Sequence, residues 1–192
     1  MRFLCLVTTV LLVVSCAAPA RRTDLQMPYD DRLRLASIYI QSGQTDRALP
    51  LLKDAAAQEA GRPAAHAMLG EILFLQGDLD GSARHLARAL EVGGDDPLIL
   101  NNLAWVELDR GNAEEALDLT DRALHLEPVP IYPYLDTRAR ILRSLGLYAD
   151  ALTDARAALN LVPEHDTEMR DHLEELIRDL EKANPGLDEE GY

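Results

Sequence analysis

The stretch GNAEEALDLTDRA, residues 111–123, has three close relatives elsewhere in the same chain. These relatives are GQTDRALPLLKDA (residues 43–55), GDLDGSARHLARA (residues 77–89) and GLYADALTDARAA (residues 146–158). Each begins with a glycine, and the four glycines follow one another at intervals of 34, 34 and 35 residues. A period of this length is typical of helix-turn-helix units that stack into an array.

The four units share residue types as well as spacing. In the third unit, Leu103 and Ala104 precede Gly111, while Ala116 and Ala123 follow it. Pro128 closes this third unit. The first unit has Leu35, Ala36, Tyr39, Gly43, Ala48 and Ala55 at the equivalent positions, and the second has Leu69, Gly70, Gly77, Ser82 and Ala89. The fourth unit has Arg138, Ala139, Gly146, Ala151, Ala158 and Pro163. This pattern resembles the tetratricopeptide repeat (TPR) family.

The resemblance implies an all-α fold, a right-handed TPR superhelix (α-solenoid) of four helix-turn-helix repeats plus a C-terminal capping helix. The repeats occupy residues 30–163, at about 30–62, 63–96, 97–130 and 131–163. Small side chains are expected where the two helices of a unit cross, because only they allow a close approach. Glycine suits the turn because it accepts a positive φ, and proline ends the second helix.

Some positions depart from the family pattern. Where the family places a tryptophan in the first helix, the chain has Arg32, His66, Leu100 and Leu135. Where the family places an aromatic residue in the second helix, the chain has Leu52, Leu86, Thr120 and Ala155. We expect slightly weaker packing at these positions and no change of fold. The stretch PVPIYP, residues 128–133, holds one extra residue and predicts a longer connection between the third and fourth units.

Residues 164–183 follow a different pattern from the repeats. Their apolar residues recur at helical spacing, and charged residues occupy the rest of the helix surface. The apolar set is Met169, Leu173, Leu176, Ile177 and Leu180. An array of repeats needs a last helix with a polar outer face, so this segment is predicted to be a capping helix. Residues 184–192 form an acidic tail.

The first residues have the pattern of an export signal. Arg2 precedes an almost unbroken apolar stretch, residues 3–14, which is too short to cross a bilayer comfortably as a helix. The following Ser15 and Cys16, with the two valines before them, resemble a bacterial lipobox. That resemblance implies a signal peptide at residues 1–15 and a lipid, palmitate included, on Cys16, whose thiol is the nucleophile that can carry it.

A lipid on this cysteine would place the protein in the bacterial cell envelope. Residues 16–29 would then be the lipidated N-terminus and a tether. Ala17 stands where an aspartate favours the inner membrane in some lipoproteins, so we expect an anchor in the outer membrane, facing the periplasm. Two alternatives stay open, namely an ordinary secretory signal cut after Ala18 or Ala20 and an uncleaved membrane anchor.

The composition excludes several classes of function. Asp and Glu outnumber Lys and Arg by 33 to 19, which gives a net charge of −14 and argues against nucleic-acid binding. The two cysteines provide no disulfide framework, and the five histidines lack the spacing of a zinc site. No phosphate-binding loop, dinucleotide fingerprint or nucleophile elbow occurs. We therefore expect no enzyme activity, no cofactor and no metal site.

Binding surfaces must then carry the function. In the TPR family, the first helix of each unit lines a concave groove that holds peptides. The resemblance therefore implies groove residues along these helices: Leu33, Ser37, Ile40, Ala67, Glu71, Phe74, Asn101, Asn102, Trp105, Leu108, Asp136, Arg140 and Arg143. Trp105 is either an anchor for the partner or a packing residue against the neighbouring helix. Arg140 and Arg143 either hold an acidic group of the partner or pair with Asp109 or Asp136.

The sequence thus predicts a membrane-anchored periplasmic adaptor that binds a protein or peptide partner. It resembles the TPR lipoproteins of bacterial envelopes, some of which assist pilus, secretion or outer-membrane assembly. Two other interpretations stay open. In the first, the protein is a structural scaffold that associates with itself through the capping helix. In the second, it is an accessory protein that recruits a peptidoglycan hydrolase or a protease.

Overall fold

The computed structural model describes residues 27–126 and 131–183. The predicted signal peptide, Cys16, most of the tether, Pro128 and the acidic tail lie outside these residues. Within the described parts of the chain there are nine α-helices and no strand. The helices are α1 (Tyr29–Gln41), α2 (Thr45–Gln58), α3 (Pro63–Leu75), α4 (Leu79–Gly93), α5 (Pro97–Asp109), α6 (Ala113–Leu124), α7 (Tyr132–Ser144), α8 (Tyr148–Leu161) and α9 (Thr167–Ala183).

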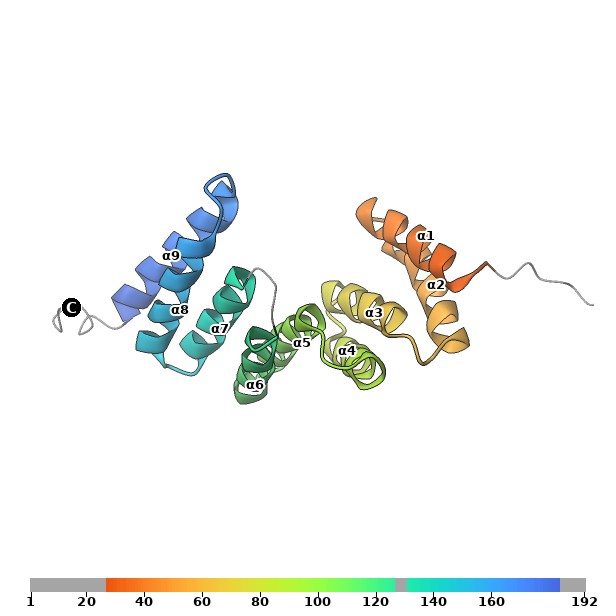
Figure 1. Ribbon diagram of the computed structural model, residues 1–192, viewed down its shortest axis with the longest axis horizontal. Helices are drawn as coiled ribbons and strands as arrows, with labels where there is room; N and C mark the ends of the chain where they lie inside the picture. The colour runs from red at the N-terminus through yellow and green to blue at the C-terminus, as the bar shows by residue number, and fades with distance from the viewer. Residues whose placement is uncertain (1–26, 127–130, 184–192) are drawn as a thin grey trace, which may run out of the picture.

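Consecutive helices pack in pairs, and each pair packs on the next. Figure 1 shows the pairs α1–α2, α3–α4, α5–α6 and α7–α8 following one another along a curved array, with α9 against α8 at the end. These pairs are the four units expected from the repeats. The fold class predicted from the sequence is confirmed.

A glycine with a positive φ follows the first helix of every unit. The φ angles are 73° at Gly43, 79° at Gly77, 86° at Gly111 and 75° at Gly146. A side chain at such a backbone conformation is strained, so glycine is favoured at each of the four turns. The regular spacing of these glycines is therefore a direct consequence of the turn geometry.

The small residues of the second helices lie at the helix crossings. Ala48, Ala116 and Ala151 have no exposed surface. In the second unit Ser82 takes the place of alanine, and its Oγ donates a 2.7 Å hydrogen bond to the carbonyl of Gly70. A Cβ on Gly70 would lie 2.5 Å from Cγ of Leu86, which is closer than packed carbon atoms approach. A side chain at position 70 would therefore require the buried side chain of Leu86 to shift.

Local signals also fix where two of the first helices begin. Pro63 and Pro97 stand in the first turns of α3 and α5, where no backbone N–H is needed. Ahead of α5, the carboxylate of Asp96 accepts hydrogen bonds from the N–H groups of Leu98 and Ile99. Pro97 and Asp96 thus fix the start of α5, the helix that carries Trp105.

Helix α9 covers the open face of α8, as expected of a capping helix. Leu173, Leu176 and Leu180 are buried in the same cluster as Ala155 and Ala158 of α8. Five of the six acidic residues of α9 lie on its exposed side: Glu168, Asp171, Glu174, Glu175 and Asp179. The helix begins at Thr167, after a short connection that follows Val162.

The departures from the family pattern are absorbed by packing. Leu100 and Leu135 are buried at the tryptophan position, and Arg32 is buried with a hydrogen bond to the side-chain oxygen of Gln58. Helix α6 ends at Leu124 and α7 begins at Tyr132, and residues 127–130 of the predicted longer connection between them lie outside the described residues. Among the described residues, none of the helices combines the length and hydrophobicity that crossing a membrane requires.

Candidate functional site

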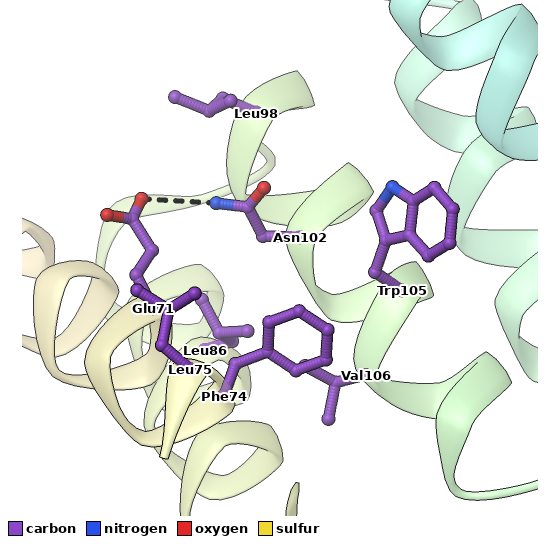
Figure 2. A pocket seen from close by; sticks show the side chains of 8 residues that line it. All are labelled: Glu71, Phe74, Leu75, Leu86, Leu98, Asn102, Trp105 and Val106. Atoms are coloured by element: carbon purple, nitrogen blue, oxygen red, sulfur yellow. Dashed lines mark hydrogen bonds between the residues drawn. The ribbon is translucent and has the colours of Figure 1, made fainter. Parts of the chain in front are cut away.

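An apolar cavity of about 370 Å³ lies between the first helices of the second and third units. From α3 it is lined by Glu71, Phe74 and Leu75, and from α5 by Leu98, Asn102, Trp105 and Val106, with Leu86 of α4 beside them. Figure 2 shows these side chains, from α3, α4 and α5, around one space. We call this space the α3–α5 pocket.

Two leucines at the edge of the α3–α5 pocket are unusually exposed for their type. Leu75 is 74% exposed and Leu98 is 56% exposed. Exposed apolar side chains are common when isolated, but here they extend the apolar lining that Phe74 and Trp105 provide. The result is a partly exposed apolar lining that a partner could cover.

A polar pair closes one side of the α3–α5 pocket. The side-chain nitrogen of Asn102 donates a 3.1 Å hydrogen bond to Oε1 of Glu71 (Figure 2). Burial among apolar groups raises the pKa of Glu71, and the hydrogen bond from Asn102 acts in the opposite direction. Glu71 is thus a carboxylate at an apolar site, although part of its side chain is exposed to solvent.

Trp105 lies in the groove as well as against its neighbours. Its side chain is half-buried and lines the α3–α5 pocket. The guanidinium of Arg140 from α7 lies 5.4 Å from the centre of the indole ring, close enough for a cation–π contact. Trp105 thus lines the α3–α5 pocket and also contacts the next unit, which fits both interpretations that the sequence left open.

Arg140 is held by its own chain. Its Nε donates a 3.1 Å hydrogen bond to Oδ1 of Asp136, and its Nη2 lies 3.1 Å from Nδ1 of His172 in α9. Asp136 is 6% exposed, so this ion pair is shielded from solvent on the carboxylate side. The pairing of Arg140 with Asp136, one of the alternatives considered above, is present. Arg143 is exposed and forms no ion pair within residues 27–126 and 131–183.

The other predicted groove residues do not line the α3–α5 pocket. Asn101 is only 8% exposed, and its Oδ1 accepts no hydrogen bond from the described residues, so burial removes it from the accessible groove. Leu33 and Ile40 pack against the core of the first unit, and Leu108 packs against the central core. The α3–α5 pocket thus brings together Glu71, Phe74, Asn102 and Trp105 from the predicted set.

Sequence reasoning missed Leu75, Leu86, Leu98 and Val106. A signal for two of them was present, because Leu98 stands four residues before Asn102, and Leu75 stands four residues after Glu71. Residues at this spacing lie on one face of a helix. Extending each helix face by one turn from the predicted groove residues would have found both leucines.

Two histidines meet outside the α3–α5 pocket. Nδ1 of His66 lies 3.0 Å from Nδ1 of His85, and the rings stack with centres 5.3 Å apart. Burial lowers the pKa of both side chains, and for His85 the neighbouring His66 lowers it further. In the described parts of the chain, no group of three or more His, Cys, Asp and Glu side chains is arranged to hold a metal ion.

Paired antiparallel helices in a curved array, with an apolar pocket between the first helices of neighbouring units, define an α-helical repeat scaffold for protein–protein interaction. Two family models described as tetratricopeptide repeat match residues 39–101 and residues 76–134, which together span half of the chain. The chain belongs to the tetratricopeptide repeat family, whose members bind protein partners.

Solved structures of low sequence identity share the fold. PilF of Pseudomonas aeruginosa is 18% identical with a TM-score of 0.73, over 82% of this chain and 69% of that one. A chain of the APC/C hetero-tetramer Cut9–Hcn1 is 17% identical with a TM-score of 0.70, over 80% of this chain and 30% of that one. A tetratricopeptide repeat protein from Parabacteroides merdae is 23% identical with a TM-score of 0.66, over 84% of this chain and 62% of that one. No curated protein sequence matches the chain.

Proposed function

We propose that the protein is a membrane-anchored adaptor of the bacterial cell envelope. In this proposal it binds a segment of a protein partner in the α3–α5 pocket and assists the assembly of an envelope complex, such as one for pili, secretion or outer-membrane biogenesis. The observation that supports binding is the apolar lining that Phe74, Leu75, Leu98 and Trp105 give this pocket. Large apolar and aromatic side chains in such positions typically supply most of the binding energy of an interface.

The envelope part of the proposal rests on the sequence around Cys16. Cys16→Ala should abolish labelling of the protein by a radioactive fatty acid and leave the precursor uncut or slowly processed. The matched control is Cys5→Ala, which lies inside the predicted signal peptide and should leave labelling unchanged. Persistent labelling of the Cys16→Ala protein would refute the lipid anchor.

The groove part is tested by crosslinking in cells from a photoreactive residue at position 105. The control position is 161, because Leu161 is an exposed apolar residue of α8, remote in sequence from the α3–α5 pocket. We expect position 105 to capture one protein reproducibly and position 161 to capture none of it. Capture of a second copy of this chain would favour the self-associating scaffold, and capture of a hydrolase or protease would favour the recruiting role.

Trp105→Ala separates binding from stability. Truncating an interface aromatic costs about 2 kcal/mol or more, which is about thirtyfold in affinity. Leu161→Ala removes an exposed apolar side chain that does not line the α3–α5 pocket, and it should leave affinity unchanged. If affinity of the Trp105→Ala protein falls only in proportion to the unfolded fraction, Trp105 is a packing residue and the binding surface lies elsewhere.

A further inference from the structure

The charges around the α3–α5 pocket indicate what kind of partner segment fits it. The sequence left open that Arg140 and Arg143 hold an acidic group of the partner. Arg140 already pairs with the shielded carboxylate of Asp136, and the exposed Arg143 does not line the α3–α5 pocket. Other arginines are also engaged within the chain, among them Arg110 with Glu107 and Arg138 with Asp154. With a net charge of −14, the chain presents an excess of carboxylates to a partner.

Glu71 is the carboxylate that lines the pocket. Its Oε1 accepts the hydrogen bond from Asn102, while its Oε2 has neither a hydrogen bond nor an ion pair with any of the described residues. The apolar walls beside it, from Phe74, Leu75 and Leu98, exclude water when a partner covers them. A carboxylate that loses water without gaining a partner is strongly unfavourable, so the bound segment must supply a donor, best a cation.

We infer that the α3–α5 pocket takes a cationic apolar peptide segment, in which a large apolar residue fills the pocket and a lysine or arginine beside it pairs with Oε2 of Glu71. This inference rests on the proposed function of the pocket as a peptide site. The long stems of lysine and arginine suit such a position, because the methylene groups can lie on Leu75 and Leu98 while the charged end reaches Glu71. An acidic segment would instead place like charges together.

The experiment uses the full-length protein in lipid nanodiscs and a phage library of random linear peptides. Selected peptides are synthesised with a fluorescent label, and affinity is measured by anisotropy. The wild-type protein should select lysine or arginine next to an apolar residue. Glu71→Gln should weaken a selected peptide about tenfold, and Glu71→Lys should reverse the selection towards aspartate and glutamate.

Glu114→Gln is the matched control, because Glu114 is an exposed carboxylate on α6, away from the α3–α5 pocket. It should leave both selection and affinity unchanged. Selection of acidic neighbours by the wild-type protein, or equal affinity for Glu71→Gln, would overturn the charge assignment. In that case Trp105-dependent binding would still support the proposed function. A failure to select any Trp105-dependent peptide would overturn the proposed function and this inference together.

Discussion

At the scale of single residues, Arg138 joins the two helices of the fourth unit to each other and to the third unit. Arg138 of α7 donates hydrogen bonds to both carboxylate oxygens of Asp154 in α8, at 2.7 and 2.9 Å, and one of 2.7 Å to Asp121 of α6. The hydrogen bonds to Asp154 raise the pKa of Arg138, so the guanidinium stays charged. Because Asp154 is only 6% exposed, its charge depends on this one arginine.

Arg138→Ala should therefore destabilise the protein by about 3 kcal/mol, since it leaves a buried carboxylate unpaired. Arg156→Ala is the matched control, because the pair between Arg156 and Glu181 is exposed and its loss should cost less than about 1 kcal/mol. Urea denaturation at neutral pH measures both changes. Similar losses for the two variants would mean that Asp154 is solvated rather than buried.

The pair of His66 and His85 predicts a dependence of stability on pH. Burial lowers the pKa of both residues, and Arg84, Arg88 and Lys53 also oppose their protonation, while Asp78 acts in the opposite direction on His85. The unfolded chain then binds more protons than the folded chain, so stability rises with pH through this range. The stability that the two neutral histidines contribute is lost progressively as the pH falls below about 6.5, which is the ordinary pKa of histidine.

The melting temperature of the wild-type protein should thus fall between about pH 7 and pH 5, and the double change His66→Gln with His85→Gln should flatten this dependence. The control is His165→Gln, which replaces an exposed histidine in the connection before α9 and should preserve the slope. An unchanged slope in the double variant would show that other groups control the pH dependence.

At the scale of the helices, the spacing of small residues determines how closely each pair can approach. Ala116 of α6 and Ala151 of α8 have no exposed surface, so a larger side chain has no space to occupy. Ala116→Leu and Ala151→Leu should each cost about 1 to 3 kcal/mol through overpacking. Asp118→Leu places the same side chain on the exposed face of α6 and should change stability by about 0.5 kcal/mol or less. Equal effects at all three positions in thermal or urea unfolding would contradict the assigned repeat phase.

The helices and their pairing could be predicted because their causes are local. A glycine with positive φ at Gly111 and an alanine at a crossing such as Ala116 are each required by sterics within one unit, and they leave a periodic trace in the sequence. The α3–α5 pocket depends on how two units are placed relative to each other. Nothing in the sequence near Arg140 shows that it contacts both Trp105 and His172, or that Asn101 is buried while Asn102 reaches Glu71.

At the scale of the whole molecule, the buried clusters do not coincide with the repeat units. The first cluster combines α1 and α2 with residues of α3, so the second unit completes the core of the first. Helix α7 contributes Tyr134 and Ile141 to the central cluster and Leu135 and Leu142 to the last one. Each unit therefore needs the first helix of the next, and α9 fulfils this role for the fourth unit because no further repeat follows α8 within the described residues.

A chain that ends at Pro163 should consequently be much less stable than one that ends at Ala183. The shorter chain exposes Leu152 and Val162 and loses the burial of Leu173, Leu176 and Leu180. Each buried leucine contributes about 1.5 to 3 kcal/mol, so the melting temperature should fall by roughly 10 °C or more. The chain that ends at Ala183 keeps all the described helices and should melt like the full-length protein. The newly exposed face should also make the shorter chain associate with rising concentration, which light scattering measures. A shorter chain that is monomeric and melts at the same temperature would show that α9 rests on α8 without completing its core.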